Sequence, residues 1–114
     1  MGEVTEYYAT LPPDVRELFD GIRRRALELV PDAVEGRSYG MPALLLGGKG
    51  LISTMQTKTH LGIYPFSGKV VSAVADRLDG FSLSSGAIRF STERPIPPDV
   101  LDDVILLRAA EIEG

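Results

Sequence analysis

The fold prediction rests on residues 38–65, SYGMPALLLGGKGLISTMQTKTHLGIYP. Apolar runs of strand length occur at 43–46, 51–56 and 61–64, and glycine, proline and lysine separate them. The glycine-rich segment 47–50 predicts a hairpin turn, because glycine adopts positive φ without strain. Successive strands with tight connections predict an antiparallel meander, and residues 34–39 supply a further strand before it.

Helical patterns precede this meander. Residues 4–11 predict a short helix with Thr5 as its N-cap, and the prolines at 12 and 13 begin a longer helix that ends by Pro31. The longer helix has an apolar face in which residues recur at three- and four-residue spacing: Val15, Leu18, Phe19, Ile22, Ala26 and Leu29. Its other face mixes acidic and basic residues, which indicates a solvated surface.

Helices also follow the meander. Residues 68–78 predict a helix with Ser67 as N-cap, residues 81–86 read as an irregular turn, and residues 87–90 predict a fifth strand. The last helix begins at Pro98, and the residues expected on its buried face are Val100, Leu101, Val104, Leu107 and Ile105. The sequence therefore predicts one α+β domain over residues 1–114, with an antiparallel sheet of about five strands packed by N-terminal, middle and C-terminal helices.

Composition limits the classes of function. The chain has 114 residues, a net charge of -4 and no cysteine. The negative charge disfavours nucleic acid as a partner, and the lack of cysteine excludes disulfides and thiolate chemistry. The N-terminal residues form no secretory signal and every apolar run is too short to span a bilayer, so we expect no membrane association and a cytoplasmic location.

A polar and aromatic sheet face is the first candidate site. Lys58, His60, Gly62 and Tyr64 alternate with apolar residues, so they share one face of their strand. The candidate ligand-binding residues are Tyr39, Met41, His60, Tyr64, Ser84, Ser85 and Arg89. Alternatively, the histidine makes a structural hydrogen bond and the tyrosines are simply good strand formers. No nucleophile-elbow pattern surrounds the serines, so a hydrolase is disfavoured.

Carboxylates are the second candidate site. Asp99, Asp102 and Asp103 cluster near the start of the last helix. Iron or calcium prefers oxygen ligands, so these residues are weak candidates for binding a metal. Alternatively, acidic residues at a helix N-terminus stabilise the helix through its dipole and need no metal.

Motifs along nearly the whole chain resemble those of the YdhG-like family, whose domain has no assigned function. They are Tyr8, SYGMP at 38–42, HLGIYP at 60–65, SSGAIRF at 84–90, PIP at 95–97 and Arg108. The resemblance implies a small α+β domain with an antiparallel sheet packed by helices. Some members are described as intracellular iron chaperones with a frataxin-like role. The chain departs from the family pattern at Ser85, where a lysine is usual.

These observations favour a non-enzymatic accessory protein that binds a small molecule or a metal ion. The alternatives are an iron chaperone that uses surface carboxylates and a structural module that self-associates, for example as a homodimer. An enzyme is the least favoured class.

Overall fold

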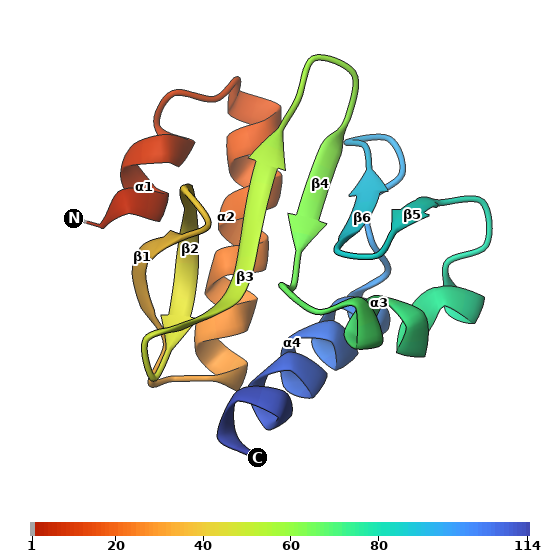
Figure 1. The fold of residues 1–114 in the computed structure, drawn as a ribbon. Helices are drawn as coiled ribbons and strands as arrows, with labels where there is room; N and C mark the ends of the chain where they lie inside the picture. Colours follow the sequence, from red (N-terminus) through yellow and green to blue (C-terminus); the bar gives the residue numbers. More distant parts are fainter. Residues whose placement is uncertain (1) are drawn as a thin grey trace.

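Four helices and six strands make up residues 2–114, the part of the chain that this computed structural model describes (Figure 1). The helices are α1 (Glu3–Tyr8), α2 (Pro13–Leu29), α3 (Gly68–Val74), which continues into a 3-10 turn at Ala75–Arg77, and α4 (Pro98–Glu113). The strands are β1 (Val34–Ser38), β2 (Met41–Leu46), β3 (Lys49–Gln56), β4 (Leu61–Tyr64), β5 (Ser82–Ser84) and β6 (Ala87–Phe90). The predicted α+β class is confirmed.

The sheet is open and antiparallel, with strand order β1-β2-β3-β4-β6-β5. The meander over the first four strands is as predicted, and β6 pairs directly with β4. The prediction of about five strands missed β5, whose residues were expected to form an irregular turn. Its three residues, Ser-Leu-Ser, carry no apolar run, and they are held extended because β6 lies beside them.

Two residues, Tyr39 and Gly40, connect β1 to β2. Their φ angles of 52° and 76° are those of a type I′ turn, so Tyr39 lies in a turn rather than in the predicted strand. Among residues 2–114, Tyr39 and Phe66 (φ 58°) are the non-glycine residues with positive φ. Aromatic residues adopt this conformation at a cost of about 1–2 kcal/mol.

Of the two predicted N-cap residues, the structure confirms one. Ser67 caps α3 as expected, because its Oγ accepts a hydrogen bond from the backbone N–H of Val70 at 3.3 Å. Thr5 is not the N-cap of α1, because the helix already begins at Glu3. Instead the Thr5 backbone N–H and hydroxyl both donate to the Glu35 carboxylate, each at 2.7 Å, which ties α1 to β1.

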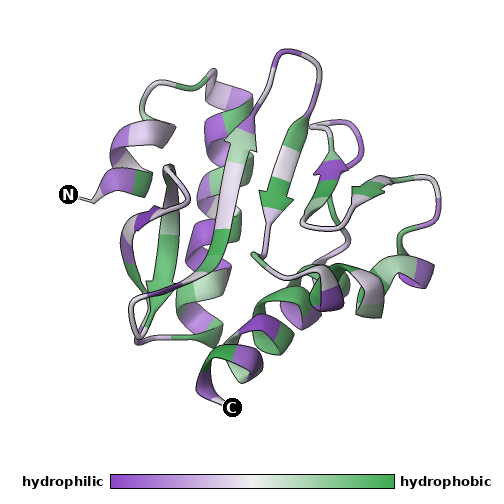
Figure 2. Ribbon diagram, viewed as in Figure 1, coloured by the Kyte–Doolittle hydropathy of each residue, from purple (hydrophilic) through white to green (hydrophobic). Residues whose placement is uncertain are grey.

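The core lies between one face of the sheet and the helices. Phe19 of α2 is fully buried and packs its ring against Phe90 of β6, with centroids 6.2 Å apart. Figure 1 shows α2 running behind β3, and Figure 2 shows hydrophobic residues concentrated on β2, β4 and the middle of α4. Ile63 and Ile88 line the same core. The helices therefore pack on one face of β3, β4, β6 and β5, and the opposite face points away from the core.

The buried face of α4 differs from the prediction at one position. Ile105 is fully buried, whereas Leu107 is 40% exposed. Arg108 explains part of this orientation, because its Nε donates to the carbonyl of Gly50 at 2.9 Å and so fixes which side of α4 meets β3. None of the helices within residues 2–114 has the length and apolar character needed to cross a membrane.

Candidate functional site

The strand register places a row of four residues across the face of the sheet that points away from the core. Met55 pairs with Gly62, Gly62 pairs with Arg89, and Arg89 pairs with Ser82. Partners in antiparallel strands share a face, and the neighbouring pair Ile63 and Ile88 lies on the core side. The row therefore brings one cationic and one hydroxyl side chain together on the outer face.

Gly62 opens a gap in this row. A Cβ atom at this position would lie 3.0 Å from the Tyr64 hydroxyl oxygen and 3.1 Å from its ring, so the Tyr64 side chain lies across Gly62. The absence of a side chain at Gly62 lets the tyrosine lie flat on the sheet beside the Gly62–Arg89 pair. Tyr64 and Arg89, both predicted site residues, are therefore neighbours on one face.

Arg89 differs from every other arginine within residues 2–114. The other arginines each donate to a carboxylate or a backbone carbonyl. Arg89 is half-buried and, inside the described part of the chain, forms neither a hydrogen bond nor an ion pair. A guanidinium carries five N–H donors in a fixed planar arrangement that matches carboxylate and phosphate groups. Arg89 thus has its full set of donors available.

Arg89 lines a hollow of about 220 Å³, which we call the hollow around Arg89. His60, Ser82 and Arg94 are among the residues that line it, and no carboxylate side chain of the described residues does. Arg94 is held in place, because its Nη2 donates to the Asp79 carbonyl at 2.7 Å and its guanidinium lies 4.4 Å from the Phe81 ring centre. These partners are neutral, so both arginines leave the hollow positively charged.

His60 forms one wall of this hollow. Its Nδ1 lies 3.0 Å from the Thr59 hydroxyl, and its backbone carbonyl accepts from the Thr57 N–H at 2.8 Å, which closes the loop between β3 and β4. His60 also lines a second hollow of about 270 Å³, together with Asp14 and Lys58. His60 and Arg89, two of the predicted ligand-binding residues, therefore line the same hollow.

The remaining predicted ligand-binding residues lie outside this hollow. Tyr39 is 88% exposed in the β1–β2 turn and stacks on Phe66, with ring centres 5.8 Å apart. Met41 follows the same turn and pairs with Ser38. Ser84 pairs with Ala87 on β6, and the carbonyl of Ser85 approaches Gly68 at the start of α3.

Two hollow-lining residues, Ser82 and Arg94, were missed by the sequence reasoning. Ser82 belongs to the strand that was expected to be a turn, and Arg94 belongs to the connection that was expected to be a stiff linker. The close spacing of Arg89 and Arg94 in the sequence was the signal that could have identified Arg94. This spacing is informative only when it is known that β6 ends at Phe90 and that the chain then turns back.

The candidate metal-binding aspartates are ion-paired with arginines. Asp102 accepts two hydrogen bonds of 2.8 Å from Arg25, and Asp99 and Asp103 both pair with Arg77, at 3.3 and 2.5 Å. The Arg25 hydrogen bonds lower the pKa of Asp102. Within residues 2–114, no three His, Cys, Asp or Glu residues are grouped so that they could hold a metal ion. The residues present therefore do not fit a bound iron.

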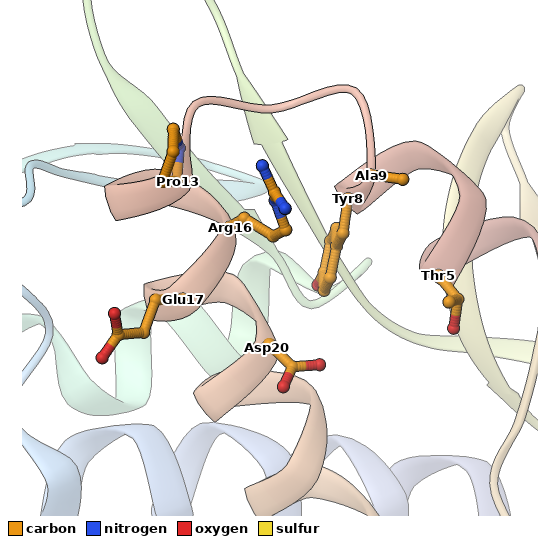
Figure 3. A pocket seen from close by; sticks show the side chains of 7 residues that line it. All are labelled: Thr5, Tyr8, Ala9, Pro13, Arg16, Glu17 and Asp20. Carbon is orange, nitrogen blue, oxygen red and sulfur yellow. The ribbon is translucent and has the colours of Figure 1, made fainter.

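A groove of about 410 Å³ lies between α1 and α2 (Figure 3). In Figure 3, Tyr8 projects between the two helices and Arg16 extends toward it from α2, whereas Glu17 points away. The polar groups of the groove are largely occupied, because Arg16 donates to the Leu11 carbonyl and Asp20 accepts from Arg23. The hollow around Arg89 offers more free donors and is the stronger candidate site.

The fold and the hollow together define a small α+β protein with an open antiparallel sheet and a hollow lined by two arginines. No family model matches the sequence, and no curated protein matches it. Among solved structures, the chain is similar to YdhG from Bacillus subtilis, a protein of the DUF1801 family. The TM-score is 0.83 over 96% of this chain and 90% of that chain, at 19% sequence identity. The resemblance to the YdhG-like family is confirmed at the level of the fold.

Proposed function

We propose that this chain is a non-enzymatic binding protein that takes a small anionic molecule, bearing a carboxylate or phosphate group, in the hollow around Arg89. The observation that carries this proposal is Arg89 itself, a half-buried guanidinium with no partner among residues 2–114 in a hollow lined by a second arginine. A partly buried charge without a partner is costly, and an anionic ligand removes this cost.

The size and chemistry of the hollow support a small ligand. Its volume of about 220 Å³ is below the range of about 300–1,000 Å³ that is usual for drug-sized molecules. Ser82 offers a hydroxyl and His60 a ring nitrogen at the walls, while Arg94 adds positive charge. Nothing in this arrangement pairs a nucleophile with a base, so binding alone is proposed.

Titration with inorganic phosphate and with citrate, followed by two-dimensional ¹H–¹⁵N NMR, tests this proposal. We expect concentration-dependent shifts for residues of β4, β5 and β6. Arg89→Gln should weaken binding about tenfold or more, because a hydrogen bond to a charged group contributes about 1.5–3 kcal/mol.

The matched control is Arg24→Gln, which removes the same charge from an arginine whose side chain is 65% exposed on α2. Equal loss of binding in both variants would mean that the net charge of the protein, and not the Arg89 side chain, determines the affinity. An Arg89→Gln protein that binds both anions as tightly as the wild type would overturn the proposal.

Iron binding by Asp99, Asp102 and Asp103 is the alternative function. The structure gives it less support, because these carboxylates already accept from Arg25 and Arg77. An iron titration by calorimetry tests it, and binding that weakens when the three aspartates become asparagines would favour it over the anion site.

A further inference from the structure

His60 and Ser91 each line two hollows of the structure. One is the hollow around Arg89, and the other is the second hollow of about 270 Å³, which Asp14 and Lys58 also line. In Figure 1, the start of α2, the loop between β3 and β4 and the loop after β6 lie at the same end of the sheet, and these segments supply most of the lining of the second hollow. The two hollows are therefore neighbours that share a wall.

Hydrogen bonds within the two loops hold this shared wall in place. The backbone N–H of His60 donates to the Thr57 hydroxyl at 3.2 Å, and the His60 Nδ1 lies 3.0 Å from the Thr59 hydroxyl. The Ser91 Oγ accepts from the backbone N–H of Arg94 at 3.0 Å. These bonds leave the Nε2 atom of His60 and the hydroxyl proton of Ser91 without a partner among residues 2–114. Both groups are available to a ligand that touches the wall.

The second hollow differs in its chemistry from the hollow around Arg89. Two arginines and no carboxylate side chain line the hollow around Arg89, whereas the second hollow has one charge of each sign, on Asp14 and Lys58. Within residues 2–114, neither of these charged side chains takes part in a hydrogen bond or an ion pair. The hydroxyl and amide side chains of the second hollow are those of Gln56, Thr57, Thr59, Ser91 and Thr92.

This lining favours a neutral group that carries several hydroxyls. A hydroxyl both donates and accepts, so it can donate to the Asp14 carboxylate or accept from the Lys58 ammonium group. A ligand ammonium group would meet the like charge of Lys58, and a second anionic group would meet that of Asp14. No Phe, Tyr or Trp among the described residues lines the second hollow, so it offers no such ring on which a nucleobase could stack.

We propose that the two hollows form one site for a small molecule that joins an anionic group to a polyhydroxylated body, as in a sugar phosphate or a sugar acid. The anionic group lies at Arg89 and the hydroxyls lie at Asp14 and Lys58, with His60 and Ser91 between them. Each hollow alone is smaller than about 300 Å³, and the two together fall within the range of about 300–1,000 Å³ that is usual for small-molecule sites. This inference rests on the proposed anion site and names its class of ligand.

Calorimetric titration with pairs of ligands tests the second hollow. Glucose 6-phosphate should bind about tenfold or more tightly than inorganic phosphate, because hydrogen bonds at Asp14 and Lys58 add to those at Arg89. Gluconate and acetate give the same comparison for a sugar acid, and the pair with the larger gain identifies the anionic group. In NMR spectra, the sugar ligand should also shift the resonances of residues 56–60, beyond the shifts that phosphate causes.

Two alanine variants locate the gain. Asp14→Ala should weaken glucose 6-phosphate binding about tenfold and leave phosphate binding unchanged, which also shows that the hollow around Arg89 is intact. Asp32→Ala, the matched control, removes an exposed carboxylate that lines neither hollow and should change neither affinity. An Asp14→Ala protein that binds glucose 6-phosphate as tightly as the Asp32→Ala protein overturns the inference.

The failure of this inference differs from that of the proposed anion site. If Arg89→Gln weakens phosphate binding but neither glucose 6-phosphate nor gluconate binds more tightly than its parent anion, the second hollow plays no part and the anion site stands. If wild-type protein binds none of the four anions, both proposals are overturned.

Discussion

A single buried hydrogen bond joins α1 to the middle of the sheet, and its removal gives a sharp test of how the first helix is held. The hydroxyls of Tyr8 and Thr54 share this bond, and both residues are buried, at 6% and 3% exposure. Burial raises the pKa of the Tyr8 hydroxyl, so it remains protonated at neutral pH. We predict that Tyr8→Phe destabilises the chain, because the Thr54 hydroxyl is then left in the core without this partner.

The magnitude follows from the burial of both groups. A buried polar group that loses its partner costs about 1–3 kcal/mol, whereas replacement of both partners by apolar groups of the same shape is nearly neutral. Tyr8→Phe and Thr54→Val should therefore each cost about 1–3 kcal/mol, and the double variant should cost less than the sum of the two. The coupling free energy in this cycle should be about 1 kcal/mol or more.

Urea unfolding followed by circular dichroism measures these free energies. Additive single effects would refute the reasoning, because they would mean that the two hydroxyls do not depend on each other.

The dependence of stability on pH gives a second measurement. A raised pKa in the folded state means that stability is fully present below the pKa of an unfolded tyrosine, about 10, and is lost as the pH rises above it. Tyr8→Phe should be less sensitive than the wild type in this alkaline range.

Three further predictions concern single side chains. Ser67→Ala should cost about 1 kcal/mol of unfolding free energy in urea, because the N-terminus of α3 loses the bond to the Val70 N–H, and Ser67→Thr, which keeps a hydroxyl for this bond and for the Glu111 carboxylate, should retain most of it. Asp102→Asn should remove a small, salt-sensitive contribution to the free energy of unfolding. In the wild type this contribution is present above the pKa of an unfolded aspartate, about 4, and is lost as the pH falls through the lowered pKa of Asp102. Equal acid unfolding curves for the two proteins would contradict this prediction. Tyr39→Gly should raise the thermal midpoint, because glycine adopts the positive φ of this turn without the cost of about 1–2 kcal/mol, and a lower midpoint would mean that the stack on Phe66 outweighs the strain.

Part of the candidate site could be predicted from the sequence. Alternation along β4 placed Gly62 and Tyr64 on the same face, because side chains alternate along any strand, whereas His60 precedes the strand. Pairing between strands cannot be obtained from alternation. The sequence therefore named Arg89 without showing that it pairs with Gly62, and it grouped Tyr39 and Met41 with residues from which the register separates them.

The acidic residues of α4 illustrate the same limit. Their clustering was plain in the sequence, and a metal site was a reasonable hypothesis from their spacing. Packing of α4 against α2 and α3 instead brings Arg25 and Arg77 to these carboxylates. Residues 77 positions apart, such as Arg25 and Asp102, meet only through tertiary structure.

The sequence by itself determined the α+β class, the antiparallel meander and most of the buried faces, because apolar periodicity and turn residues are local properties. Tertiary structure alone decided the insertion of β6 between β4 and β5, the edge position of β1 and the environment of Arg89, whose guanidinium has no partner within residues 2–114. These features depend on which segments pair across long sequence separations, and that choice is made by the packing of the whole core.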